Sequence, residues 1–199
     1  GQSVLDLRRV NLAFGIDYIR LDPPAYAHPP VLEAINQADA IILGPGDIYT
    51  SVIPNLLVQD VAEAIVSSKA IKIHVCNLMT KPGESDDFKA SDFAKLLMAY
   101  LGTTNPLDYL IFNDTPYPER LVQRYALDGQ HPVKLDIDDC LRVTKNILEW
   151  PLLAAGVYLR HEPLSLGKAI MAIINSYDGD PIVTSDAGTE SRDLTSQTV

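Results

Sequence analysis

Cysteine is scarce in this sequence, whose 199 residues include only Cys76 and Cys140. They form no C-x-x-C pair, and neither lies near a histidine at the spacing of a metal site. Cys76 ends an apolar segment, so we expect a buried and unreactive thiol there. So little cysteine, together with the lack of a visible export signal, favours a location in the cytoplasm.

Long apolar runs and positive charge are also missing. No run approaches the roughly 20 residues that span a bilayer. The 16 Lys and Arg residues are outnumbered by 26 Asp and Glu residues, which gives a net charge of −10. Such an acidic chain is a poor partner for nucleic acid or an anionic membrane. A local anion site stays compatible with this charge, since it needs only a few backbone donors.

The ends of the sequence differ from its middle. It begins Gly1-Gln2-Ser3 without a methionine, and residues 6–19 have the character of a strand already under way. We therefore expect a piece of a longer protein. Residues 1–177 are expected to form one domain, because the chain is 47% apolar and 21% charged. Residues 178–199 turn to Asp, Ser, Thr and Gly, which predicts an acidic, disordered tail.

Apolar segments with strand and helix periodicity alternate along the chain. We expect strands at 16–21, 40–43, 71–76, 107–112, 132–135, 142–147 and 156–159. Helices are expected at 31–37, 55–68, 91–100, 119–126 and 164–176, with Ser91 as a cap and Gly102 as a stop. This order predicts a three-layer, Rossmann-like α/β fold with a mainly parallel sheet and helices on both faces.

The segment 39–51 has the order strand, glycine loop, helix. Ligands of an open α/β sheet bind at the carboxyl ends of its strands. Glycines let backbone N–H groups approach an anion, and a helix N-terminus favours negative charge. The expected site is a phosphate held by Gly44, Gly46, Thr50 and Ser51, with Pro45 between the glycines. The alternative is an ordinary turn, because many βα turns contain Gly and Pro.

Each of three further residues in or near this loop has two possible roles. The carboxylate of Asp47 repels an anion, so it either holds Mg²⁺ or caps the following turn. Tyr49 either stacks on a base or packs on the sheet. Asn55 either contacts the ligand or caps the helix.

The loop after the strand at 71–76 contains four polar candidates. Asn77 is able to bond a sugar hydroxyl or a base edge, and Lys81 to pair with phosphate as a point charge. Glu84 is a candidate for a hydroxyl group or a divalent cation. In the alternative reading, Asn77 and Thr80 fix the turn while the two charged side chains are solvated.

The strand at 107–112 ends in Asn113 and Asp114, which are either ligand contacts or turn residues. Three consecutive strands thus end in polar loops, and parallel strands bring such loops to one edge of the sheet. Arg160 is a candidate phosphate fork. The isolated His28, His74 and His131 are assigned structural roles. No Ser-His-Asp order, zinc pattern or complete P-loop appears, so no catalytic residue is named.

At these loops the sequence resembles the CofD/YvcK-like family. The resemblance rests on segments 38–51, 53–58, 75–85, 108–113 and 160–163, and it extends over residues 1–177. It implies the carboxyl-terminal half of such a protein. The family's amino-terminal half, with a first glycine-rich loop, an Asp-Asp-Gly-Gly segment and a Pro-Pro-Gly-Asp segment, has no counterpart here.

Two branches of the family imply different functions. YvcK-like proteins are cytoplasmic, bind UDP-sugars, and are linked to gluconeogenic growth, cell shape and wall synthesis. CofD proteins are transferases that move 2-phospholactate from a nucleotide diphosphate donor to a deazaflavin with Mg²⁺, a role in which Asp47 or Asp114 would help to hold the metal. The Gly-Pro-Gly-x-x-Tyr-Thr-Ser and Asn-x-Met-Thr strings resemble the first branch.

The resemblance therefore implies a regulatory protein that binds a UDP-sugar or a related nucleotide diphosphate, with no certain cofactor. A homodimer is compatible with it. The sequence departs from the family pattern at three positions: Asp47 replaces a usual Ser, Lys81 replaces a usual Gln, and Phe93 stands where His is expected.

Overall fold

The computed structural model describes residues 16–177. The expected strand character of residues 6–15 and the expected tail at 178–199 lie outside this range. The elements follow one another in the order α2 (Pro29–Gln37), β1 (Ala40–Leu43), η1 (Ile48–Val52), α3 (Ile53–Leu56), α4 (Val61–Ser67), β2 (Ile71–Val75), α5 (Ala90–Leu101), β3 (Leu107–Asn113), α6 (Glu119–Ala126), α7 (Ile137–Cys140), β4 (Thr144–Trp150) and α8 (Pro163–Tyr177).

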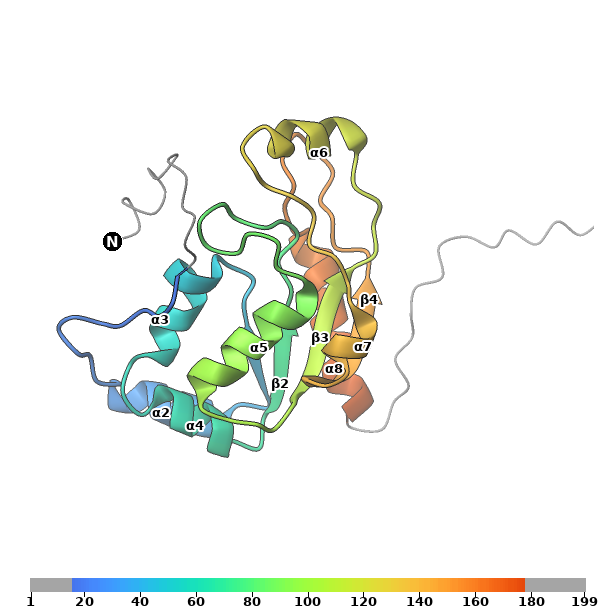
Figure 1. Cartoon of the computed structure of the whole chain (residues 1–199). Coiled ribbons are helices and arrows are strands. Elements are labelled where there is room, and N and C mark those ends of the chain that lie inside the picture. Colours follow the sequence, from blue (N-terminus) through green and yellow to red (C-terminus); the bar gives the residue numbers. More distant parts are fainter. Residues whose placement is uncertain (1–15, 178–199) are drawn as a thin grey trace, which may run out of the picture.

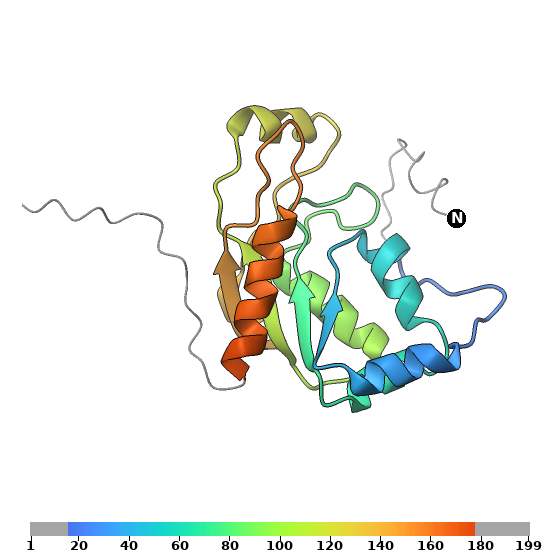
Figure 2. The ribbon, with the colours of Figure 1, turned by 180° about the vertical axis from the view of Figure 1, so that it is seen from behind.

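The four strands form one parallel sheet in the order β1-β2-β3-β4. Helix α5 covers one face (Figure 1) and α8 covers the other (Figure 2). This arrangement confirms the expected three-layer, Rossmann-like α/β fold. The carboxyl ends of the strands point to the upper edge of the sheet in Figure 1, where α6 and the longest loops gather.

Each face of the sheet has its own apolar core, because successive side chains of a strand point to opposite faces. On β2, Ile71, Ile73 and Val75 pack toward the α8 layer, whereas His74 points to the other layer. Phe93 of α5 is fully buried on that other side, with its ring edge-to-face on Phe88 at 5.3 Å. Among residues 16–177, no helix is long and apolar enough to cross a membrane.

Three expected strands are absent from the described part of the chain. Segment 16–21 forms no strand, and the N–H group of Ile19 donates to the Tyr100 hydroxyl at 3.0 Å instead of to a neighbouring strand. Segment 132–135 makes two isolated bridges, at Pro132 and Lys134. Segment 156–159 is the tip of a loop closed by a bridge between Leu153 and His161.

The helix expected at 55–68 is broken into α3 and α4. Asp60 adopts a left-handed conformation with φ +73°. Just before it, Gln59 exchanges backbone hydrogen bonds with the segment at 25–27, donating to the Ala25 carbonyl at 2.9 Å. A continuous helix would use these groups internally, so this pairing ends α3.

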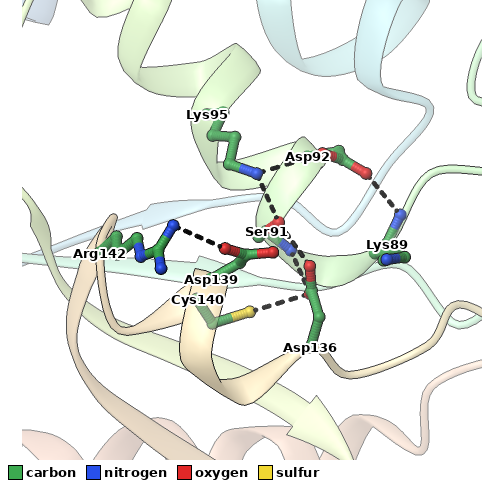
Figure 3. A network of polar contacts seen from close by, with 8 residues as sticks. All are labelled: Lys89, Ser91, Asp92, Lys95, Asp136, Asp139, Cys140 and Arg142. Atoms are coloured by element: carbon green, nitrogen blue, oxygen red, sulfur yellow. Dashed lines mark hydrogen bonds and ion pairs between the residues drawn. The ribbon is translucent and has the colours of Figure 1, made fainter.

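A polar network holds the start of α5, and it corrects the expected cap (Figure 3). Helix α5 begins at Ala90, so Ser91 is not its N-cap. The carboxylate of Asp136 accepts hydrogen bonds from the Ser91 N–H at 3.0 Å and from its hydroxyl at 2.6 Å. Burial acts to raise the pKa of Asp136, but the hydrogen bonds from Ser91 and Cys140 outweigh it and lower the pKa. Gly102 ends α5 with φ +68°, as expected.

We expect Asp136→Ala to lower the free energy of unfolding by about 2 kcal/mol, because a buried hydroxyl and a helix-start N–H lose a charged acceptor. Urea denaturation at neutral pH measures this loss. Asp138→Ala, which removes an exposed carboxylate from α7, is the control and should cost a few tenths of a kcal/mol. Equal losses for the two variants would contradict this role of Asp136.

Candidate functional site

The first loop leaves β1 through Gly44, which has φ +89°. A Cβ atom at this position would lie 3.0 Å from the Val75 carbonyl oxygen, a close approach to the backbone of β2. Glycine is therefore required by both conformation and space. The peptide bond between Gly44 and Pro45 is cis. Beyond it, Pro45, Gly46 and Asp47 reach the surface of a cleft.

The loop after β2 joins the first loop through side chains. The Asn77 amide donates to the Gly46 carbonyl oxygen over 2.9 Å. Lys81 Nζ lies 2.6 Å from Asp47 Oδ2 and 2.9 Å from Glu84 Oε1. Asp47 and Lys81, two of the three departures from the family pattern, thus contact each other across the two loops.

The cleft between these loops has a volume of about 700 Å³. It lies beyond the carboxyl ends of β1 and β2, and segments from the upper edge of the sheet complete its walls. Its lining residues are Pro45, Gly46, Asp47, Asn77, Leu78, Met79, Thr80, Lys81, Tyr125, Gln130, Leu159, Arg160 and His161. Seven of the expected site residues are therefore brought together: Pro45, Gly46, Asp47, Asn77, Thr80, Lys81 and Arg160.

The loop after β3 does not line this cleft. Asn113 is buried, and its amide donates to the Thr115 carbonyl while its side-chain oxygen accepts from Leu152 N–H at 3.0 Å. The exposed Asp114 donates its backbone N–H to the Trp150 carbonyl. Both residues hold the backbone after β3 in place, which agrees with the alternative that they are turn residues.

The residues directly after Asp47 do not line the cleft. Tyr49 is buried; burial raises its pKa, and the neighbouring Tyr100 and Glu84 add to the effect. The Thr50 hydroxyl is buried and has no hydrogen-bond partner among the described residues. The Ser51 N–H donates to the Asp47 carbonyl at 2.8 Å, and the Asn55 amide donates to the Ser51 carbonyl at 2.7 Å.

The side chain of Asp47 makes no capping hydrogen bond to η1, so the alternative that it caps the turn is wrong. Its partner is the ammonium group of Lys81 instead. Thr80 holds its loop in place, because its N–H donates to the His131 carbonyl at 2.7 Å and its hydroxyl accepts from His131 N–H at 3.0 Å. These contacts agree with the alternative in which Thr80 fixes the turn.

His161 is a cleft residue that the sequence analysis missed. Its Nε2 lies 3.2 Å from the Cys76 carbonyl oxygen, and burial lowers its pKa even though this contact acts in the opposite direction. Only its place beside Arg160 in the 160–163 motif marks it in the sequence. Tyr125 and Gln130, which also line the cleft, carry no such signal.

Aromatic and cationic side chains are in contact with one another beside Arg160. The Arg160 guanidinium lies over the Tyr158 ring at 5.3 Å from its centroid, and Arg124 lies 5.4 Å from the same ring. The Tyr125 hydroxyl accepts a hydrogen bond from Leu159 N–H at 3.2 Å, which connects α6 to the 151–162 loop. Of these two arginines, Arg160 lines the cleft, and its guanidinium group is in contact with the Tyr158 ring.

The other titratable groups near the strand ends are buried. Both cysteines are free and buried, as expected for Cys76; burial raises the pKa of both thiols, that of Cys140 to about 12. The ring Nδ1 of the fully buried His74 lies 3.0 Å from the Leu43 carbonyl oxygen, directly before the glycine loop. Its burial and its contact with a backbone carbonyl are compatible with the structural role expected for it.

Among the described residues that line the cleft, the one carboxylate is that of Asp47. Within residues 16–177, no group of three or more His, Cys, Asp or Glu side chains is placed to hold a metal ion. The Asp47 carboxylate is paired with Lys81, and Asp114 lies outside the cleft. Because Mg²⁺ is commonly held by one or two carboxylates together with substrate phosphates, a role for this cation stays a prediction.

The family model described as "2-phospho-L-lactate transferase CofD" matches residues 7–153. Two relatives, each described as "Putative gluconeogenesis factor", are 39% identical over 178 residues (Thermoanaerobacterium thermosulfurigenes) and 41% identical over 162 residues (Thermotoga maritima). These matches cover 87% and 78% of this chain but 54% and 50% of the relatives, so the chain spans about half the length of the curated relatives it matches.

A solved structure is also similar to this chain. The crystal structure of a member of the UPF0052 family from Bacillus halodurans matches with a TM-score of 0.70 and 34% sequence identity. The match covers 73% of this chain and 47% of that chain. The parallel α/β layers are therefore shared with an experimentally solved relative.

Proposed function

The chain belongs to the CofD/YvcK-like family, and from this premise we propose that it binds a UDP-sugar in the cleft beyond β1 and β2. The proposed role is regulatory and linked to gluconeogenic growth, cell shape and wall synthesis. The observation that carries the proposal is the hydrogen bond from Asn77 to the Gly46 carbonyl, which joins the glycine loop and the second loop into one wall. Ligands of open α/β sheets bind at this edge.

Arg160 is proposed to bind the diphosphate. Arg160 is one of the residues that line the cleft, and the planar fork of its guanidinium group matches phosphate oxygens. Tyr125 and Gln130 offer a ring and an amide to the base or the sugar. The backbone at 45–47 approaches the ligand, in keeping with the glycine loop. In this proposal Thr50 and Ser51 support the loop and do not themselves contact phosphate.

Isothermal titration of the full-length natural protein with UDP-glucose and UDP-N-acetylglucosamine tests this proposal. We expect heat of binding, and a dissociation constant about tenfold higher or more for Arg160→Ala, because a charged hydrogen bond to phosphate is lost. Arg120→Ala is the matched control, since Arg120 is an exposed arginine of α6 that does not line the cleft. Absence of heat with every nucleotide sugar would end the proposal.

A CofD-type transferase is the second candidate, because the matching family model carries that description. Of the two carboxylates named as alternatives for it, Asp47 lines the cleft and Asp114 does not. Incubation of the protein with a deazaflavin acceptor and a phospholactyl donor decides between the two, and formation of the phospholactyl product would favour the transferase.

We propose no nucleic-acid or membrane partner, because the net charge of −10 disfavours both. A homodimer and a cytoplasmic location stay predictions. Sedimentation and cell fractionation respectively measure them.

A further inference from the structure

Asp47, Lys81 and Glu84 form an ion-pair cluster in the wall of the cleft. The ammonium group of Lys81 lies between the two carboxylates, 2.6 Å from Asp47 and 2.9 Å from Glu84. The side chains differ sharply in exposure: 37% for Asp47, 23% for Lys81 and 1% for Glu84. Asp47 is thus the carboxylate of the cluster that a ligand in the cleft is able to reach.

The charges of this cluster do not favour an anion. Two carboxylates and one ammonium group sum to −1 when Glu84 is ionised and to zero when it is protonated. Burial raises the pKa of Glu84, while the hydrogen bond and charge of Lys81 act against that rise. In neither protonation state does the cluster offer net positive charge. Lys81 is consequently a structural cation here and a poor partner for phosphate.

A second cationic residue of the cleft, Arg160, lies on a different segment. Arg160 belongs to the loop between β4 and α8, and its ring contact with Tyr158 is shared with Arg124. The cleft therefore has an arginine, Arg160, for a phosphate group and a carboxylate, that of Asp47, for hydrogen-bond donors. A sugar presents hydroxyl donors, whereas the terminal phosphate of a nucleoside diphosphate presents only charge and acceptors at neutral pH.

We propose that the ion-pair cluster determines specificity: Asp47 accepts hydrogen bonds from the hydroxyl groups of the sugar, and the cluster disfavours a free terminal phosphate at that place. This inference rests on the proposed nucleotide-sugar function and adds to it a way to separate UDP-sugars from UDP. Lys81 holds the Asp47 carboxylate in position, and the buried Glu84 holds Lys81 in turn.

The test compares the dissociation constants of UDP and UDP-glucose, measured by isothermal titration on the full-length natural protein and on Asp47→Asn. The substitution keeps the shape of the side chain but removes its charge, which leaves the Lys81 cation less compensated. We expect UDP-glucose to bind more weakly and UDP more tightly, so that the preference for UDP-glucose falls about tenfold or more. Tighter binding of UDP is not a result that a damaged fold produces.

Asp114→Asn is the matched control, since it removes an exposed carboxylate that does not line the cleft. Asp47→Glu, which restores the charge, should retain part of the preference. Should Asp47→Asn fail to fold, Asp47→Ser removes the same charge, and the same comparison applies.

The outcomes distinguish failure of this inference from failure of the proposed function. When the natural protein binds both ligands but Asp47→Asn leaves their ratio unchanged, or weakens both equally, this inference is overturned while the proposed function stands. When the natural protein binds neither ligand, the proposed function fails and this inference fails with it.

Discussion

Gly44→Ala is expected to lower the free energy of unfolding by about 2–3 kcal/mol. Two physical effects combine at this position. The residue has φ +89°, which disfavours any side chain, and the new Cβ would lie 3.0 Å from the Val75 carbonyl oxygen. That oxygen belongs to the backbone of β2, so it is unable to move aside without disturbing the sheet. Chemical denaturation of the natural and variant proteins measures the loss.

Gly102→Ala provides the control for this prediction. Gly102 also has a positive φ, +68°, but a Cβ there would meet nothing within 4 Å. We expect a loss of about 1 kcal/mol from the left-handed conformation alone. If Gly44→Ala cost no more than Gly102→Ala, close approach to Val75 would not be what requires glycine after β1.

Acid is expected to destabilise the protein through His74, with a loss of about 3 kcal/mol between neutral pH and pH 4. Burial lowers the pKa of His74 from 6.5 to about 4, although its contact with the Leu43 carbonyl acts in the opposite direction. The unfolded chain therefore binds the proton first as the pH falls below 6.5. The stability contributed by the neutral ring is complete above that pH and is lost progressively down to about pH 4.

His74→Gln isolates this contribution, because glutamine keeps a donor for the Leu43 carbonyl but does not titrate. Urea denaturation at several pH values between 7 and 4 should show a shallower loss of stability for the variant. His28→Gln, an exposed position directly before α2, serves as the control and should keep the natural slope. Identical slopes for the natural protein and His74→Gln would show that acid acts elsewhere.

Much of the fold could be predicted because it depends on local pattern. The expected helix at 119–126 has the bounds of α6, and the expected strand at 40–43 has those of β1. The segments that failed are ones whose backbone groups find distant partners. The Ile19 N–H donates to the Tyr100 hydroxyl, and Gln59 pairs with Ala25, so neither the strand at 16–21 nor the continuous helix at 55–68 forms.

The candidate site, too, was predicted in part. Polar loops after β1 and β2 were expected to meet, and they do, because parallel strands place their carboxyl ends together. The loop after β3 was expected to join them, but the amide of Asn113 is engaged with Thr115 and Leu152. No periodicity distinguishes a strand-end amide that faces a ligand from one that fixes a turn.

By itself, the sequence determined the parallel α/β layering, the glycine loop and the family, because periodicity, turn residues and motifs are properties of neighbouring residues. Only the tertiary structure decided that Lys81 is bound by Asp47, 34 positions away, and that Asp136 holds the start of α5 from 45 positions beyond Ser91. Such partners are set by how the loops pack at the edge of the sheet. Charge and hydrogen bonding act through space, and the spacing of residues along the chain does not contain those distances.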